Sequence, residues 1–444
     1  MYQDVRGSDQ PLRQQERTLN NFAPSFYQSP QYARRQPQRQ LFAVGGNGAA
    51  YLTFAALCTA SFVYAFFADF LGGAGETARI VAIIGTAGLT MVGAAICLFR
   101  GLILASILSV AGVLSIFLFL YIFSFNSGVP FTLNSGGEYI GLTFTGLFAL
   151  TLQDKTFKKL MKWFYWLCVT YAFFYLIASA AVRIGLVDTG GVARAVATAD
   201  DAGRSDRLHS ASLLLLYGTG YSVASLREKF SIRALLLTTL FASCWVATES
   251  RAITLLVVIA VLGYAILKNV ALLGRMTFIV FVAGSAFSVM LIVDPSLNPF
   301  LYFGDQSASV RTNSIDIVSQ SIQYYWLTGA GISFGVENYK PLTGITYFFP
   351  GDIGMIGILY TYGIAGFLLY TWLCYLGCVS YEMVSDAVGD YAVATGVALS
   401  CIVYALYSLQ SPQYNGGSSG SIFAMMLVAL VLHLRRETPT RRRM

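Results

Sequence analysis

Long apolar runs constrain this chain more than any other feature of its sequence. Between Tyr51 and Leu434 the sequence is mostly apolar, and its longest break is the polar segment from about Asp294 to Asp352. A run of roughly 20 apolar residues matches the hydrocarbon thickness of a lipid bilayer. Only 11% of the residues are charged, whereas about a quarter are charged in a typical soluble domain. We therefore predict an all-α polytopic membrane protein, because continuous runs do not fit the alternating pattern of a barrel.

The apolar runs predict about twelve transmembrane helices. They cover residues 49–71, 79–98, 102–124, 138–153, 160–183, 210–226, 234–248, 252–267, 276–293, 352–376, 389–409 and 417–434. Two of these runs, 138–153 and 234–248, are short and fit either tilted spans or partly buried helices. No soluble module separates the runs, so residues 49–434 are expected to form one transmembrane domain. Residues 294–351 are then its large loop, with short helices of its own.

Both ends of the chain are polar and basic. Residues 1–48 are rich in Gln, Arg and Pro, which predicts a disordered arm rather than a signal peptide. Residues 435–444 predict a basic tail. With both ends in the cytoplasm, 21 of the 29 basic residues fall on the cytoplasmic side and 8 on the other. This distribution follows the positive-inside rule and places the large loop on the extracytoplasmic side.

Cysteine and histidine usage gives no sign of a disulfide framework or a metal site. All seven cysteines fall within apolar runs, and the chain has only two histidines. We therefore predict no metal and no cofactor. The net charge of +7 comes mostly from the two ends, where basic residues set topology or contact anionic membrane lipids, and nucleic acid is not an expected partner.

Several arginines on the extracytoplasmic side have no topological reason to be there. Arg204, Arg207 and His209 come just before a predicted span, where guanidinium groups and a helix N-terminus suit a phosphate-bearing ligand. The alternative is a network of Asp and Arg residues that only caps the helix. Arg251 lies between two predicted spans with almost no spacer. Either an anionic ligand or a salt bridge to Glu249 would explain a cation at this position.

The large loop contains a predicted amphipathic helix. Apolar side chains recur every three to four residues from Val310 to Trp326, and Ser307 or Ser309 is a candidate cap. Arg311 would then lie in the first turn, where a cation opposes the helix dipole, which favours a ligand-binding role. The Gly-Ala-Gly sequence at residues 329–331 has the wrong spacing for a nucleotide loop and predicts a turn instead.

Asp352 follows Pro350-Gly351 at the start of a predicted span. One interpretation is a helix N-cap, worth about 1 kcal/mol. The other is a general base, which requires a positioned carboxylate near an acceptor hydroxyl. The residues alone favour neither interpretation.

The order of these features resembles the O-antigen ligase and Wzy-type polysaccharide polymerase superfamily, over residues 200–370. That family has an arginine-containing segment before one span and a Ser-Arg pair after another. Its large periplasmic loop carries an early Arg, an aromatic residue and Gly-x-Gly, and then a catalytic dyad ahead of Gly-x-x-Gly. The matching residues here are Arg204 and Arg207, Ser250-Arg251, Arg311, Trp326, Gly329 and Gly331, Asp352-Ile353, and Gly363 and Gly366. Ligases usually place His-Asn at the dyad, so Asp352 is more similar to exopolysaccharide polymerases.

The resemblance implies a metal-independent, inverting polymerase of a bacterial inner membrane with a periplasmic active site. Donor and acceptor would be undecaprenyl-pyrophosphate-linked oligosaccharides, and a chain-length regulator and a flippase of the same pathway are further implied partners. Asp352 would take the acceptor proton, while Arg207, Arg251 and Arg311 would offset charge on the leaving pyrophosphate. Candidates for stacking on sugars, or for an interfacial belt, are Tyr302, Phe303, Tyr324, Tyr325, Tyr347 and Phe348.

Two alternatives to a polymerase remain. A ligase of the same superfamily would transfer a polymer to a different acceptor. A transporter or flippase of lipid-linked glycan would place ionisable residues inside its spans, along the path of the substrate. Arginines gathered at one face of the membrane would favour catalysis over transport.

Overall fold

The computed structural model describes residues 47–64, 66–186, 196–197, 207–208, 210–302, 306–333, 339–346, 348–411 and 427–433. The chain divides into two compact units, Met1–Ala43 and Val44–Met444. The first unit lies outside the described residues, and with it nearly all of the predicted arm at residues 1–48. The predicted tail at residues 435–444 also lies outside them.

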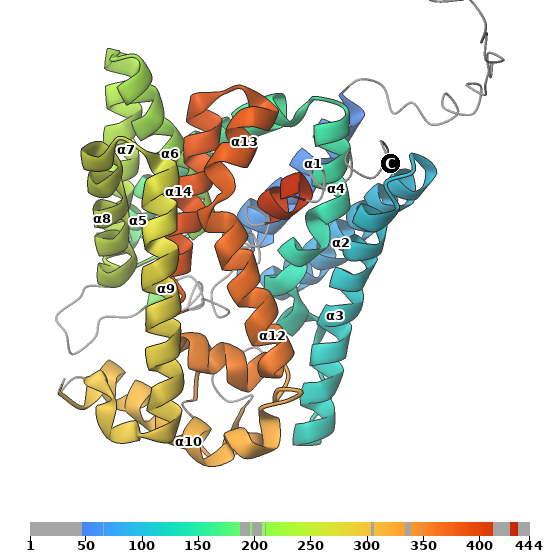
Figure 1. Ribbon diagram of the computed structural model, residues 1–444, viewed down its shortest axis with the longest axis vertical. Coiled ribbons are helices and arrows are strands. Elements are labelled where there is room, and N and C mark those ends of the chain that lie inside the picture. The colour runs from blue at the N-terminus through green and yellow to red at the C-terminus, as the bar shows by residue number, and fades with distance from the viewer. Residues whose placement is uncertain are drawn as a thin grey trace, which may run out of the picture. The chain divides into compact units, whose positions relative to one another are not determined.

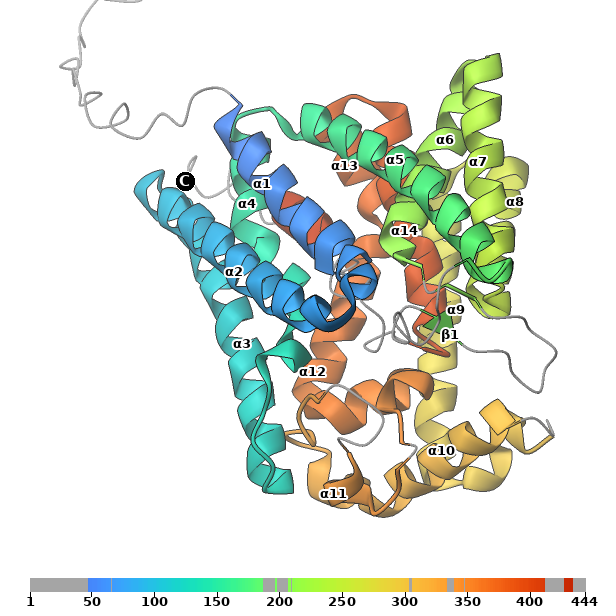
Figure 2. The same cartoon turned by 180° about the vertical axis from the view of Figure 1, so that it is seen from behind.

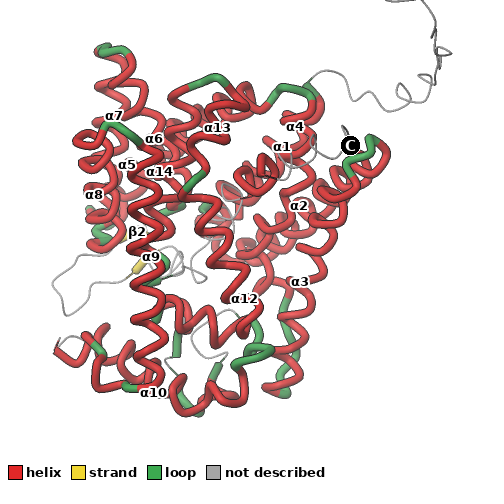
Figure 3. The backbone as a smooth tube through the Cα atoms, in the orientation of Figure 1, coloured by secondary structure: helices red, strands yellow, loops and turns green. Residues whose placement is uncertain are grey.

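The second unit is helical (Figure 3). Its α-helices are α1 (Gly48–Cys58), α2 (Gly75–Phe99), α3 (Ile103–Ser127), α4 (Thr145–Gln153), α5 (Phe157–Arg183), α6 (Ser212–Glu228), α7 (Ile232–Thr248), α8 (Arg251–Leu267), α9 (Val270–Val293), α10 (Gln306–Tyr325), α11 (Lys340–Thr343), α12 (Gly354–Cys378), α13 (Ser380–Val388) and α14 (Tyr391–Tyr407). A π-helix, η1 (Thr59–Tyr64), and the 3-10 helices η2 (Phe67–Ala74), η3 (Leu133–Phe144), η4 (Pro295–Leu297), η5 (Pro299–Tyr302) and η6 (Pro350–Asp352) complete them. The strands of the described residues are β1 (Val196–Ala197) and β2 (Arg207–Leu208), which pair antiparallel. Apart from this short ladder, the predicted all-α fold is confirmed.

Among the described residues, five helices are long and apolar enough to cross a membrane, namely α2, α3, α5, α9 and α12. Shorter apolar helices accompany them at Gly48–Tyr64, Tyr139–Gln153, Ile232–Thr248, Arg251–Leu267 and Tyr391–Tyr407. Of the last predicted run, 417–434, only residues 427–433 are described, and they are helical.

Large apolar side chains are exposed along the outer helices. Val81, Leu114, Leu236, Leu255 and Ile279 are each more than half exposed, and they lie on five different helices. Soluble proteins rarely leave so much apolar surface uncovered, whereas lipid tails would cover it. Helices α6 and α14 are instead buried along most of their length and pack against each other. The chain is therefore a membrane-embedded helix bundle with a buried central pair.

Three predicted runs differ from the observed helices. The run 138–153 forms the 3-10 helix η3 followed by α4, in which Thr145–Leu152 are all buried. The run 49–71 is an α-helix that continues as π-helix and then as 3-10 helix. The run 352–376 is interrupted, because α12 has a non-helical residue at Gly363 and its two pieces run in different directions (Figure 1).

The large loop lies at one end of the bundle. Figure 1 places α10 at this end, which we call the loop end, and places α13 at the opposite end, which we call the α13 end. Helices α1, α2 and α5 run obliquely between the two ends (Figure 2). At the α13 end, Arg100 pairs with Asp154 at 2.7 Å, and Lys158 and Lys162 both pair with Asp390.

Candidate functional site

The large loop folds around its own apolar core. Ile315 and Val318 of α10 are buried there against Phe348 and the start of α12. Phe123 from α3 and Leu291 from α9 join the same core. The predicted amphipathic helix is confirmed as α10, whose apolar face holds it against the bundle.

Two details of the predicted loop helix are wrong. Ser307 and Ser309 lie inside α10 and do not cap it, because the helix already begins at Gln306. For the same reason Arg311 lies in the second turn and not the first. The helix dipole acts mainly within the first turn, so it does not explain the position of Arg311.

The Gly-Ala-Gly turn at residues 329–331 is joined to the break in α12. A helix interrupted at Gly363 leaves the carbonyl groups of Tyr360 and Thr361 without their usual partners. These two carbonyl groups accept hydrogen bonds from the N–H groups of Ala330 and Gly331, at 2.7 and 3.0 Å. The Ile364 N–H donates to the backbone carbonyl of Trp326. The backbones approach so closely that a Cβ atom on Gly363 would lie 2.2 Å from the Leu327 carbonyl oxygen. The loop is thereby fixed to α12 just beyond the segment that carries Asp352.

Asp352 ends the 3-10 helix η6 and is partly buried. The N-cap of α12 is Ile353, and no side chain makes a capping hydrogen bond there. The carboxylate has no hydrogen-bonding or ion-pair partner among the described residues. The structure therefore excludes the interpretation of Asp352 as the N-cap of α12.

Arg311 lies over an aromatic ring whose position is fixed by a buried asparagine. Asn298 is fully buried; its side chain donates to Thr312 Oγ1 at 3.3 Å and accepts from the Phe300 N–H at 3.0 Å. This bridge ties η5 to α10 and sets Phe300 beside Arg311, whose Cζ lies 5.2 Å from the ring centroid. The Arg311 Nε is buried and has no hydrogen-bond partner among the described residues. A buried, unpartnered guanidinium N–H is costly, which points to a ligand.

Arg311 and Asp352 interact electrostatically. Burial raises the pKa of the Asp352 carboxyl above its usual value, and the positive charge of Arg311 lowers it in part. A carboxylate whose pKa is raised by burial is a stronger base than one in water. The structure therefore brings together two of the residues expected at the site, one on α10 and one at the start of α12.

Arg251 lies elsewhere, at the first residue of α8, and is exposed. Its neighbour Glu249 accepts a hydrogen bond from Arg183 at 2.8 Å, and Arg183 also donates to the Ala247 carbonyl. Arg183 thus ties the end of α5 to the turn between α7 and α8. An ion pair with Arg183 was not foreseen, because the two residues are far apart in sequence.

The predicted cluster before α6 is mostly outside the described residues. This holds for Arg204, His209 and the side chain of Arg207, of which only the backbone is described, in β2. The next residue, Leu208, is buried, and its carbonyl accepts from the Tyr175 hydroxyl at 2.9 Å. This contact anchors β2 to α5.

The aromatic residues of the loop divide into two groups. Tyr302 and Tyr324 are mostly exposed, at 85% and 75%, and remain available to a ligand. Phe348 is fully buried against Tyr339 and Tyr360 and belongs to the loop core. Phe303 and Tyr347 lie outside the described residues.

Asn298 and Phe300 were not expected at the site. The signal that marks them is the Asn-Pro pair at residues 298–299, since such pairs favour a turn. The turn itself does not reveal that Asn298 reaches back to α10.

The arrangement at the loop end can accept a proton and bind an anion. Asp352 supplies a carboxylate of raised pKa, and Arg311 supplies a fork of N–H donors suited to phosphate or carboxylate oxygens. No family model, curated protein or solved structure matches this chain. The fold and the site define a membrane-embedded helix bundle with a carboxylate and a guanidinium that interact electrostatically at one end.

Proposed function

We propose that this chain is a membrane glycosyltransferase that polymerises lipid-pyrophosphate-linked oligosaccharide units into an exopolysaccharide or O-antigen chain. The observation that carries the proposal is the electrostatic interaction of Asp352 with Arg311, two groups without hydrogen-bonding partners among the described residues, at the loop end of an apolar bundle. The resemblance of the sequence to polysaccharide polymerases supplies the reaction class.

The proposed reaction is a single displacement at the anomeric carbon of the donor sugar. An acceptor hydroxyl oxygen forms the new bond to that carbon, and its proton passes to the Asp352 carboxylate. The bond from the anomeric carbon to the pyrophosphate oxygen breaks, and the pyrophosphate leaves with the electron pair. Arg311 offsets the charge that develops on this leaving group, and the configuration at the carbon inverts.

The distribution of charge supports an enzyme over a transporter. The arginines whose side chains are described all lie near helix ends: Arg79, Arg100, Arg183, Arg227, Arg233, Arg251, Arg275 and Arg311. A transport path would require ionisable residues in the middle of spans. In the proposed arrangement about twelve helices span a bacterial inner membrane, both termini are cytoplasmic and the loop end faces the periplasm.

The proposal is tested by complementing cells that lack the endogenous gene with Asp352→Asn. The substitution keeps the size of the side chain and removes the base. We expect polymer to fall by about 10²–10⁴-fold while single lipid-linked units accumulate, since that is the usual contribution of a general base. Polymer length on gels and the pool of lipid-linked units are the measurements.

Asp316→Asn is the matched control. Asp316 is a carboxylate further along α10, on a different face of the helix from Arg311, and its substitution should leave polymer unchanged. Both variants are compared at equal membrane expression. Normal polymer from the Asp352→Asn protein would remove Asp352 from the mechanism.

A further inference from the structure

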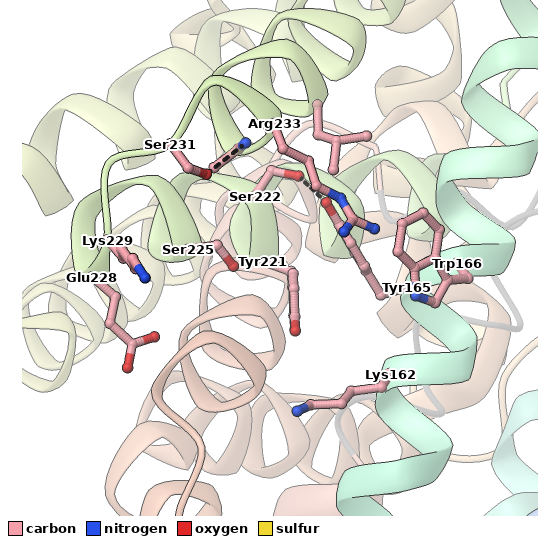
Figure 4. A pocket seen from close by; sticks show the side chains of 12 residues that line it. Lys162, Tyr165, Trp166, Tyr221, Ser222, Ser225, Glu228, Lys229, Ser231 and Arg233 are labelled. Carbon is pink, nitrogen blue, oxygen red and sulfur yellow. Dashed lines mark hydrogen bonds between the residues drawn. The ribbon is translucent and has the colours of Figure 1, made fainter.

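A second candidate site lies at the α13 end, between α5, α6 and α7. It is a cavity of about 390 Å³, within the usual range of roughly 300–1,000 Å³ for sites that bind small molecules. Figure 4 shows its basic side chains on opposite walls, with Lys162 from α5, Lys229 from the α6–α7 turn and Arg233 from α7. Glu228 is the single acidic residue of the lining, so the cavity has a positive balance.

The aromatic side chains of the cavity form its apolar walls. Tyr165 and Tyr221 stack with their ring centroids 4.0 Å apart, and Tyr165 shares a hydrogen bond with Ser222. Trp166 is 46% exposed, and the Arg233 guanidinium carbon lies 5.0 Å from the centroid of its ring. These contacts hold Arg233 in place without consuming its N–H donors.

The three cations differ in how far they are already engaged. Lys162 is paired with Asp390 at 3.4 Å and remains about half exposed. Lys229 and Arg233 have no ion-pair or hydrogen-bond partner among the described residues for their charged groups. Two cations without such partners in the lining of one cavity give it a positive field that attracts an anion.

The position of the cavity points to a lipid. Lys229 and Arg233 alternate with Phe230 and Ile232, which are 73% and 74% exposed. In this pattern the apolar side chains enter the acyl-chain region while the basic ones reach the level of the headgroups. The lining residue Leu237 continues the apolar surface into the cavity.

We propose that this cavity binds the phosphate-bearing headgroup of an anionic phospholipid, with its acyl chains lying against the exposed face of α7. Lys229 and Arg233 hold the phosphate, and the aromatic walls cover the glycerol backbone. The site is at the opposite end of the bundle from Asp352, and it does not depend on the proposed polymerase activity.

The test uses the purified full-length protein in a neutral detergent, titrated with phosphatidylglycerol and followed by native mass spectrometry. The protein should bind phosphatidylglycerol more tightly than phosphatidylcholine. The double variant Lys229→Gln, Arg233→Gln should weaken phosphatidylglycerol binding by about tenfold or more, because each basic residue at an anionic surface adds to the affinity. Lys268→Gln is the control, since Lys268 is an exposed cation between α8 and α9 that does not line the cavity.

Three results would overturn the proposal. One is equal affinity of the unaltered protein for phosphatidylglycerol and phosphatidylcholine. Another is an equal loss of binding in the Lys268→Gln protein, which would indicate a general effect of surface charge. The third is displacement of phosphatidylglycerol by an equal concentration of glycerol 3-phosphate, which would assign the site to a soluble phosphate compound.

Discussion

The proposed reaction depends on two residues, Asp352 and Arg311. The sequence predicts both as site residues through their match to the polymerase motifs. The sequence did not decide whether Asp352 is a helix cap or a general base. The structure excludes the cap, because Ile353 occupies the N-cap position of α12. Asn298 and Phe300 could not be predicted, since their roles depend on a contact between η5 and α10 that leaves no periodic pattern.

The interaction between Arg311 and Asp352 predicts a pH effect. Arg311 lowers the pKa of Asp352, so removing the charge in Arg311→Gln should raise that pKa further. A base works only when deprotonated, and the acidic limb of the activity profile should therefore move to higher pH. Polymerase activity of reconstituted protein, normalised to the maximum of each variant, is the measurement.

Lys340→Gln is the control for this experiment, because Lys340 is an exposed cation of the same loop. Its acidic limb should coincide with that of the unaltered protein. An acidic limb that stays in place in the Arg311→Gln protein, or that moves to lower pH, would contradict the assignment of Asp352 as the base.

At the scale of elements, apolar patterning finds helices but not their interruptions. The run 352–376 looked continuous, because the hydrophobicity of a helix does not change where its hydrogen bonds are broken. The interruption at Gly363 follows from the fit between α12 and the Gly-Ala-Gly turn, which are separated in sequence by the rest of the loop. The sequence does show the glycines of the junction, Gly329 and Gly331 in the turn and Gly363 in α12.

The junction predicts a difference between two glycine substitutions. Gly344 and Gly363 both have positive φ angles, of 72° and 65°, but a Cβ atom on Gly344 would meet nothing within 4 Å. Gly344→Ala should cost about 1–2 kcal/mol from backbone strain alone. Gly363→Ala should cost more, because the Cβ atom would also collide with the Leu327 carbonyl group. Melting temperatures in detergent provide the comparison, and equal losses of stability would argue against the tight junction.

For the whole molecule, the sequence predicted a helical membrane protein but not which helices are interior. Lipid tails and protein interiors are similarly apolar, so α6 and α14 look like lipid-facing spans although they are buried. For the same reason, the apolar pattern of α4 does not reveal that this helix is buried. Charge adds to apolarity in predicting which segments lie at opposite ends of the bundle.

The two ends of the bundle should differ in access from outside the cell. Lys340→Cys at the loop end should react with a membrane-impermeant maleimide in intact cells. Lys268→Cys should react only after the cells are permeabilised. The unaltered chain is the control, because six of its seven cysteines are buried and Cys58 is partly buried. Labelling of Lys268→Cys in intact cells would reverse or refute the proposed orientation.

The attachment of the large loop to the bundle limits how this protein can be recombined with others. The core of the loop includes Phe123 and Leu291. Its backbone N–H groups donate hydrogen bonds to the carbonyl groups of Phe119, Tyr360 and Thr361. A chimaera that exchanges only residues 294–351 would leave each of these contacts facing a foreign partner. The smallest exchangeable block is therefore discontinuous, and it joins the end of α3 to the whole segment from the last turn of α9 through the break in α12.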